Sequence, residues 1–304
     1  MNRNNNYISV IVSAYDRKKY LLEALKSVTD QSLPRDKYEI ILVKNFNDET
    51  IDKFAEQNNI QNLYSEDKRF SGKILEALSV ANGDIICFLD DDDVFYPNKL
   101  SYVHQKFLDN EKLCYIHNKF SAIDENGRTI AYYNDNPDFN MSSINIKKEI
   151  IDIKSLTKVT KSIDTLMYLF ALESGMPIEL DSETLTYYRV SSESVTHAFN
   201  DIDSFRKFSY NSLNNILNSY VQMLSIFHSQ KVQKILKHKI SFTKIRLYLF
   251  GGNRVKLRDY LNILVSPTLE SRTYEIKVAV ASLFMKKYTV DKLYKNEKAK
   301  QKYA

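Results

Sequence analysis

The sequence predicts an α/β protein, with a largely parallel sheet flanked by helices and a mostly helical C-terminal extension. Strand-like and helix-like segments alternate four times within the first 90 residues, which is the order that builds a parallel sheet. From about residue 201 onward, the apolar residues recur mostly at helical spacing. The 304 residues suffice for one large domain or two ordinary ones, and an apolar content of 43% is typical of a folded globular chain.

The first part of the chain supplies the strands of this sheet in order. Residues 7–13, YISVIVS, are apolar without alternation, as expected of a strand that is buried on both faces. The segment after it places Leu21, Leu25 and Val28 on one face of a helix. The same order continues with expected strands at 38–44, 60–65 and 83–89 and expected helices at 47–58 and 73–81. Gly83 suits the stop after the last of these helices.

The pattern changes after Pro97. We expect a helix at 98–110, then a hairpin made of the strands 113–124 and 128–133. Residues 134–147 are rich in Asn and poorly patterned, which predicts a loop. A helix at 160–174 and a strand at 183–191 follow.

Four consecutive aspartates, Asp90 to Asp93, stand directly behind the strand at 83–89. In parallel sheets, ligands bind beyond the carboxyl ends of the strands, and residues 13–17 and 44–47 reach the same edge. Adjacent carboxylates repel one another and resist desolvation, so a positive group is expected among them. A divalent cation is the first candidate, and a charged turn without an ion is the alternative.

The charge is divided unevenly along the chain. Residues 1–200 carry 23 Lys and Arg against 31 Asp and Glu, a net −8, and residues 201–304 carry 20 against 7, a net +13. The basic region is either a solvated helical surface or a contact with anionic membrane or lipid phosphate. Its stripe of Ile276, Val280, Leu283 and Phe284 suits a helix at a membrane interface, but equally one packed on the rest of the chain or on a second subunit.

Neither a secretory signal nor a membrane span is expected. The longest apolar run near the C-terminus, residues 278–285, is far shorter than the roughly 20 residues that a spanning helix needs. Cys87 and Cys114 both lie in apolar runs, which predicts two buried free thiols and fits a reducing compartment. We therefore expect a cytoplasmic protein, either free or held peripherally on the inner face of the membrane.

Three stretches of the chain resemble the inverting glycosyltransferases of family 2. Residues 9–31, SVIVSAYDRKKYLLEALKSVTDQ, resemble the opening of that family, and residues 81–100, ANGDIICFLDDDDVFYPNKL, resemble its D-x-D segment. Residues 163–197, from IDTLMYLF to YYRVSSESVTH, resemble its third block. The resemblance implies a GT-A fold, with a nucleotide-sugar-binding half at 1–97 and an acceptor half at 98–200, and it does not cover the basic helical region at 201–304.

The resemblance also implies roles for the acidic residues. Asp90 and Asp92 match the family's D-x-D, which would hold Mg²⁺ or Mn²⁺ against the donor pyrophosphate. Asp92 is the first choice as a direct metal ligand, whereas Asp90 would bind either the metal or the ribose of the donor. Asp91, at a variable position, is counted with the donor site, and Asp93 would brace the following turn. Asp164 matches the family's acceptor-side base, although Ile163 replaces the Glu that usually precedes it. Its alternative is a helix-start aspartate stabilised by the helix dipole.

The donor site is drawn from the loops after the first two strands and from the SGK stretch. The residues assigned to it by resemblance, besides Asp90 and Asp91, are Ser13, Ala14, Tyr15, Arg17, Asn45 and Lys73. Lys44 and Asn45 replace the two aspartates that the family commonly carries there, so a UDP-sugar is only the default donor. Lys73 would contact pyrophosphate, or else be a surface lysine. Arg189 would meet phosphate or pair with a carboxylate, and His197 could serve as a further metal ligand.

The leading hypothesis is thus a metal-dependent glycosyltransferase that acts on a glycan or polyprenyl-phosphate-linked acceptor. The first alternative is a catalytically degenerate relative that binds nucleotide-sugar or scaffolds a glycan-assembly complex; Lys44, Asn45 and Ile163 are its basis. The second alternative is a nucleotidyltransferase. Such an enzyme would be expected to carry a Gly-rich phosphate loop after the first strand, and SAYDRKKY contains no Gly. No nucleic-acid partner is expected, and a homo-oligomer is left open.

Overall fold

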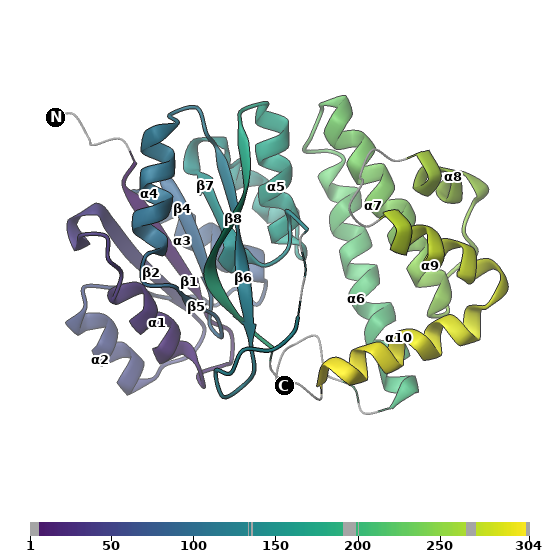
Figure 1. Cartoon of the computed structure of the whole chain (residues 1–304), viewed down its shortest axis with the longest axis horizontal. Coiled ribbons are helices and arrows are strands. Elements are labelled where there is room, and N and C mark those ends of the chain that lie inside the picture. The colour runs from purple at the N-terminus through teal and green to yellow at the C-terminus, as the bar shows by residue number, and fades with distance from the viewer. Residues whose placement is uncertain are drawn as a thin grey trace. The chain divides into compact units, whose positions relative to one another are not determined.

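The computed structural model describes residues 6–132, 134, 136–190, 199, 201–265 and 272–301 (Figure 1). The strands are β1 (Ile8–Ser13), β2 (Tyr38–Lys44), β3 (Gln61–Tyr64), β4 (Ile85–Asp90), β5 (Val94–Phe95), β6 (Tyr115–Ile123), β7 (Ile144–Lys147) and β8 (Ile178–Arg189). The helices are α1 (Leu21–Thr29), α2 (Glu49–Gln57), α3 (Phe70–Val80), α4 (Lys99–Asp109), α5 (Ile163–Ser174), α6 (Ile202–Met223), α7 (Gln230–Leu249), α8 (Leu257–Val265), α9 (Arg272–Phe284) and α10 (Lys286–Gln301).

The strands of the described residues form one sheet in the order β3-β2-β1-β4-β7-β6-β8-β5. The first four of these neighbours, β3 to β4, run parallel, as the alternation of strands and helices predicts. β7 is antiparallel to both β4 and β6, whereas β6 and β8 are parallel to each other. The carboxyl ends of β1, β2 and β4 therefore lie at one edge of the sheet.

Helices cover the parallel part of the sheet on both faces (Figure 1). Alternate strand residues such as Val10, Leu42 and Cys87 form one core with the apolar faces of α1, α2 and α4. α3 packs against β1 and β2 and buries Ile74 and other apolar residues. Burial on both faces explains why these strands read as continuous apolar runs.

The expected hairpin after β6 is reduced to a single antiparallel bridge, and the expected loop is wrong at its end, where residues 144–147 form β7. Residues 128–133 contribute only an isolated bridge, Ile123 to Thr129, among their described members. The antiparallel partner of β6 is β7, which lies inside the stretch predicted as a loop. β7 escapes prediction because polar residues lie buried there: Asn145 is fully buried and its amide donates to Ile116 O and Asn118 Oδ1. Hydrogen bonds to distant parts of the chain make such burial tolerable.

Gly83 has a different role from the predicted helix stop. The backbone at Ala81 is already extended, so the end of α3 needs no left-handed residue. A Cβ on Gly83 would lie 2.4 Å from the backbone nitrogen of Ser9, and Gly83 N donates to Ser9 Oγ at 2.8 Å. A glycine is required here because the chain passes close to β1.

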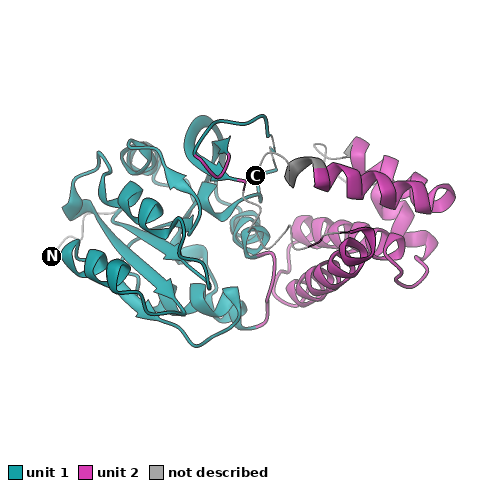
Figure 2. Ribbon diagram, turned by 90° about the horizontal axis from the view of Figure 1, so that it is seen from below, with its two compact units in different colours: residues 1–123, 127–157, 163–189 teal, residues 124–126, 158–162, 190–304 magenta. Residues whose placement is uncertain are grey.

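The chain divides into two compact units (Figure 2). Unit 1 comprises residues 1–123, 127–157 and 163–189 and holds the sheet, and unit 2 comprises 124–126, 158–162 and 190–304. In unit 2, helices α6 to α10 pack around their own apolar clusters, one of which contains Phe205, Leu213 and Val290. The predicted helical region after residue 201 is present in the part that the structure describes.

Two smaller predictions concern the thiols and the membrane. Cys87 and Cys114 are free and buried, as expected. Across the described residues, no helix is long and apolar enough to cross a bilayer.

Candidate functional site

The loops after β1 and β4 meet at the carboxyl edge of the sheet in unit 1. Ser13 is the register partner of Asp90, so the ends of the two strands lie side by side. Ala14 N donates to Val43 O at 2.9 Å, which ties the loop after β1 to β2 as well. The structure thereby brings together the residues that the sequence assigns to the donor site.

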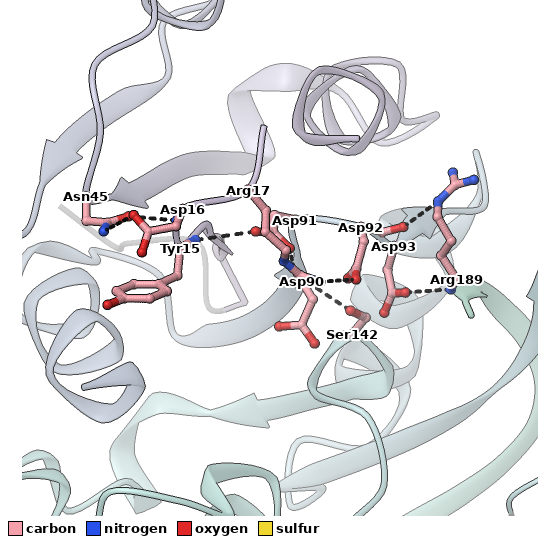
Figure 3. A network of polar contacts seen from close by, with 10 residues as sticks. All are labelled: Tyr15, Asp16, Arg17, Asn45, Asp90, Asp91, Asp92, Asp93, Ser142 and Arg189. Atoms are coloured by element: carbon pink, nitrogen blue, oxygen red, sulfur yellow. Dashed lines mark hydrogen bonds and ion pairs between the residues drawn. The ribbon is translucent and has the colours of Figure 1, made fainter. Parts of the chain in front are cut away.

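Arg17 lies among the aspartates (Figure 3). Its Nη1 donates to Asp92 Oδ2 at 2.6 Å, and its Nη2 forms a short ion pair with Asp91 Oδ1. Tyr15 N donates to the other oxygen of Asp91 at 3.3 Å. The expected positive group is therefore present, supplied by the protein's own guanidinium, whose side chain is 30% exposed.

Asp93 and Arg189 connect the aspartate loop to β8. Arg189 N donates to Asp93 Oδ1 at 2.8 Å, and Arg189 Nε donates to the carbonyl of Asp92 at 2.9 Å. Its Nη2 reaches Glu23 Oε2 at 2.7 Å, and the guanidinium lies 4.2 Å from the centroid of the Tyr20 ring. Arg189 thus pairs with a carboxylate, one of its two predicted roles, and Asp93 braces β8 rather than only its own turn.

The aspartates carry strongly perturbed acidities. Burial, reinforced by the charges of Asp92 and Asp91, raises the pKa of Asp90 to about 8, although Arg17 opposes this. Burial and the charge of Asp92 raise the pKa of Asp91 to about 7. Burial likewise raises the pKa of Asp93 well above its usual range. One guanidinium does not neutralise this cluster, which therefore favours a further cation.

Tyr15 and Lys73 lie together on the donor side of the loop. Lys73 Nζ is 4.2 Å from the centroid of the Tyr15 ring and donates to the carbonyl of Asp67 at 2.7 Å. Lys73 is 1% exposed, and burial lowers its pKa. The alternative of a surface lysine is wrong, whereas Tyr15 is 41% exposed and can offer its ring to a ligand.

Asn45 is held by Asp16, a residue that the sequence reading did not assign. Asp16 N donates to Asn45 Oδ1 at 3.0 Å, and Asn45 Nδ2 donates to Asp16 Oδ1 at 2.8 Å. Asp16 has a φ of 53°, a left-handed conformation that brings its amide and carboxylate to the same neighbour. Lys44 is buried and pairs with Asp52 at 2.9 Å, so its charge is already compensated.

Asp164 lies in the first turn of α5, as predicted, and accepts a hydrogen bond from Thr165 N at 2.7 Å. Its charge also contributes to the raised pKa of Asp90, after burial and the neighbouring aspartates. Asp164 is therefore close enough to the aspartates at the end of β4 for their charges to interact. Both of its predicted readings, acceptor-side base and helix-start residue, agree with this position.

Several other residues contact the site, although no sequence motif indicates them. Asp90 N donates to Ser142 Oγ at 3.0 Å, and the carbonyl of Ser142 accepts from Thr186 Oγ1 at 2.9 Å and from the buried Lys99. Glu23 lies on α1, 166 positions from Arg189. Such long-range contacts could not be found from spacing. His197 lies outside the described residues.

The acidic cluster has the oxygen ligands that a hard divalent cation prefers, but it does not supply enough of them to hold the ion alone. Its donors are carboxylate oxygens, the ligands that Mg²⁺ and Mn²⁺ take. Burial, and after it the neighbouring carboxylates, raises the pKa values of Asp90 and Asp91, so a bound cation would favour their charged forms. Among the described residues, no three His, Cys, Asp or Glu side chains are grouped so that they could hold an ion by themselves. Asp92 and Asp90 fit such an ion if a pyrophosphate supplies further oxygens.

Comparison with known sequences identifies one family and several partial relatives. The family model described as "Glycosyl transferase family 2" matches residues 9–169. An uncharacterised glycosyltransferase of Rickettsia bellii is 27% identical over 131 residues, which is 42% of this chain and 19% of that protein. Glycosyltransferase GlyG of Streptococcus pneumoniae is 28% identical over 147 residues, covering 46% of this chain and 48% of that protein. The chain thus spans between about a fifth and a half of these relatives.

Solved structures resemble the whole chain at low sequence identity. S. aureus TarS 1-349 in complex with UDP-GlcNAc has a TM-score of 0.51 at 16% identity, covering 95% of this chain and 91% of that one. Mannosyltransferase PcManGT from Pyrobaculum calidifontis, in complex with GDP-Man and Mn²⁺, has a TM-score of 0.59 at 14% identity, covering 98% and 86%. These likenesses show the fold, and the predicted GT-A type α/β architecture with a helical C-terminal region is confirmed.

Proposed function

Since this chain belongs to glycosyl transferase family 2, we propose that it is a metal-dependent inverting glycosyltransferase. It would transfer a sugar from a nucleotide-sugar donor to a glycan or lipid-linked acceptor. The observation that carries the proposal is the acidic cluster at the end of β4, which faces the loop after β1 and interacts electrostatically with Asp164. These contacts support a leaving-group site at the end of β4, with Asp164 near enough to serve as the base.

The donor side would hold the nucleotide and its pyrophosphate. Tyr15 offers a half-exposed ring beside Lys73, and the Asp16–Asn45 pair presents both hydrogen-bond donors and acceptors to a base. Arg17 and Lys73 supply positive charge for the phosphates. A UDP-sugar is only the default donor, because Asn45 stands where the family commonly carries a carboxylate. Among similar folds, TarS binds UDP-GlcNAc and PcManGT binds GDP-Man.

Asp90 and Asp92 would hold Mg²⁺ or Mn²⁺, with the pyrophosphate completing the coordination. When bound, such an ion neutralises charge that develops on the leaving nucleoside diphosphate. Arg17 would turn from the carboxylates toward the phosphates as the donor enters. Its guanidinium, which is always charged, would help to stabilise the negative charge that develops on the leaving group.

Asp164 would act on the acceptor side. A direct displacement that inverts the anomeric carbon needs a base on the face opposite the leaving group. The Asp164 carboxylate would take the proton from the acceptor hydroxyl as the new glycosidic bond forms. Thr165 N, which donates to Asp164 Oδ1, orients that carboxylate at the start of α5.

One observation supports a second candidate, a nucleotide-sugar-binding protein without turnover. Arg17 already pairs with Asp91 and Asp92, so the cluster has a partial counter-charge without any metal. The replacement of the usual Glu by Ile163 leaves a single carboxylate at the acceptor position. This candidate predicts donor binding that is unaffected by a chelator.

A thermal-shift screen of nucleotide-sugars, with and without Mn²⁺, tests both candidates. A ligand that binds the native state raises stability by about 2.7 kcal/mol at a concentration of 100 times its Kd. We expect a nucleotide-sugar to raise the melting temperature only when Mn²⁺ is present. A shift of equal size in EDTA would favour the non-catalytic candidate, and a panel without any shift would contradict both.

The acceptor and the place of action are also proposals. We propose that the acceptor is a growing glycan or a polyprenyl-phosphate-linked sugar, and that the basic C-terminal region makes peripheral contact with an anionic membrane. The support is the net charge of +13 in residues 201–304, where each Lys or Arg near an anionic surface contributes about 1 kcal/mol.

A further inference from the structure

Helix α8 exposes its leucines and buries its acidic residue. Leu257, Leu261 and Leu264 are 75%, 50% and 50% exposed, whereas Asp259 is 4% exposed. The three leucines follow the spacing i, i+4 and i+7, so they form one row along the helix. We call them the α8 leucine row. An ordinary surface helix has the opposite arrangement.

The inward face of α8 shows that this arrangement belongs to the fold. Asp259 accepts a hydrogen bond from Ser241 Oγ at 3.0 Å and lies 3.7 Å from Lys244 Nζ, both on α7. Ile263 is 1% exposed and packs in an apolar cluster with Ile245. Turning α8 to bury the leucine row would expose Ile263 and break the contacts of Asp259.

Helix α9 repeats the pattern. Glu275 is 9% exposed and its Oε2 lies 2.6 Å from Nε2 of His238 on α7. On the outside, Val280 and Leu283 are half-exposed and Phe284 is 81% exposed. The stripe read from the sequence at this helix is therefore largely uncovered within the chain.

A basic cavity adjoins the α8 leucine row. It has a volume of about 290 Å³ and lies between α6, α7 and the entry to α8. Its charged lining residues are Lys244, Arg254, Lys256, Arg258 and Asp259. Since Asp259 is turned toward Ser241 and Lys244, the cavity has an excess of positive charge. Lys256 and Arg258 stand directly on either side of Leu257, so cationic and apolar groups alternate where α8 begins.

The charges around the exposed apolar residues point to one kind of occupant. Within residues 252–264 and 273–287, the exposed charged side chains are all basic: Arg254, Lys256, Arg258, Lys277 and Lys287. A second copy of this chain that met the surface in a symmetric contact would bring like charges together. An anionic lipid surface complements both properties, because leucines enter the acyl boundary and basic groups meet the phosphates.

We propose that α8 and the adjoining basic cavity form the membrane-contacting surface of unit 2. The α8 leucine row would enter the interface of an anionic bilayer, and Lys256 and Arg258 would hold lipid phosphates at the cavity. This inference rests on the proposed peripheral contact and names the residues that make it.

Co-sedimentation of the full-length protein with vesicles tests the surface. The vesicles are either pure phosphatidylcholine or a mixture of phosphatidylcholine with the anionic lipid phosphatidylglycerol. We expect Leu257→Ser, Leu261→Ser and Leu264→Ser together to weaken binding to the anionic vesicles at least ten-fold. The matched control, Leu108→Ser, Leu180→Ser and Val221→Ser, removes three exposed apolar side chains elsewhere and should bind as the wild type does.

A second pair of variants tests the cavity. Lys256→Gln with Arg258→Gln should weaken binding by about five-fold per charge, the equivalent of about 1 kcal/mol for each basic residue. Lys26→Gln with Lys112→Gln removes two exposed charges from unit 1 and should weaken binding less. Unchanged melting temperature and nucleotide binding in each variant show that unit 1 is intact.

The possible failures can be told apart. A wild-type protein that stays in the supernatant at low salt overturns the proposed peripheral contact itself. Anionic binding that survives the leucine and charge variants leaves that contact in place and overturns the surface assigned here. A concentration-dependent dimer that only the leucine variants dissociate, measured by light scattering, would show that a second copy covers the row.

Discussion

Arg17 occupies the position of a counter-ion to Asp92, with Nη1 and Oδ2 2.6 Å apart. The same guanidinium pairs with Asp91, so it neutralises part of the cluster that we assign to a divalent cation. The pair gives the site two ways to balance its negative charge, by the protein's own cation or by a bound ion.

Asp92→Asn should abolish metal-dependent donor binding and leave the fold intact. The change removes the proposed metal ligand, and losing one of four like charges relieves repulsion within the cluster. Calorimetric titration with nucleotide-sugar, with and without EDTA, measures it, and Asp36→Asn on the exposed surface is the control. Donor binding that is unchanged in the variant and indifferent to EDTA would refute the metal assignment.

Arg17→Gln should lower the melting temperature of the metal-free protein at neutral pH. Among the described residues, the carboxylates of Asp91 and Asp92 would lose Arg17 as their ion-pair partner, and a buried charge without a partner is costly. Mn²⁺ alone should then raise the melting temperature more in the variant than in the wild type. Arg206→Gln, which removes an exposed pair in unit 2, should do neither. An equal response to Mn²⁺ would mean that Arg17 and the ion do not share these carboxylates.

Asp164→Asn should retain donor and metal affinity and lose turnover. Removing a general base typically lowers the chemical step by about 10²–10⁴-fold without changing the nucleotide pocket. Transfer from the donor found in the thermal-shift screen measures the rate, and calorimetry measures the affinity. Glu173→Gln, at the other end of α5, is the matched control. A variant that turns over near the wild-type rate would leave Asp164 as a helix-start residue.

The stability of the metal-free protein should fall as the pH rises from about 4 to 7. The folded-state pKa values of Asp90 and Asp91, about 8 and about 7, lie above those of the unfolded chain, so the native state binds more protons in this window. Stability is greatest where both states are protonated. It is lost over the pH range in which the unfolded carboxylates are ionised and the native ones are still protonated, by at most about 1.4 kcal/mol per pH unit for each group. The buried Lys99, whose pKa is lowered to about 7, has the opposite effect only above that window.

Urea unfolding at several pH values checks this slope. Asp90→Asn cannot ionise and should flatten the slope, and saturating Mn²⁺ should flatten it in the wild type if the ion binds there. Asp36→Asn should keep the wild-type slope. A wild-type stability that rises steadily over the same range would contradict the raised pKa values.

Much of unit 1 could be predicted because its information is local. A continuous apolar run such as residues 7–13 indicates a strand buried on both faces, and the spacing of Leu21, Leu25 and Val28 indicates the helix after it. The aspartates lie next to one another in the chain, so their meeting at the end of β4 needed no tertiary information. The donor loop follows from the rule that parallel strands present their carboxyl ends at one edge.

The parts that were missed depend on contacts between distant residues. β7 was read as a loop because its buried Asn145 looks polar in sequence, and only partners on β6 make that burial tolerable. Periodicity also cannot tell which face of a helix turns inward. In α8, the apolar row at Leu257 and Leu261 faces out, because Asp259 finds its partners on α7.

The sequence by itself determined the family resemblance, the alternating strands and helices of the parallel part of the sheet, and the place of the acidic cluster. Each of these depends on residues that are neighbours in the chain or that repeat with a fixed period. Only the tertiary structure decided that Arg17 is the counter-ion of Asp92 and that Arg189 joins Glu23 across 166 positions. Side-chain pairing and burial are set by the packing of the whole chain. The sequence around a charged residue or a leucine is the same whether its side chain contacts water, another residue or a ligand, so the sequence alone does not reveal the partner.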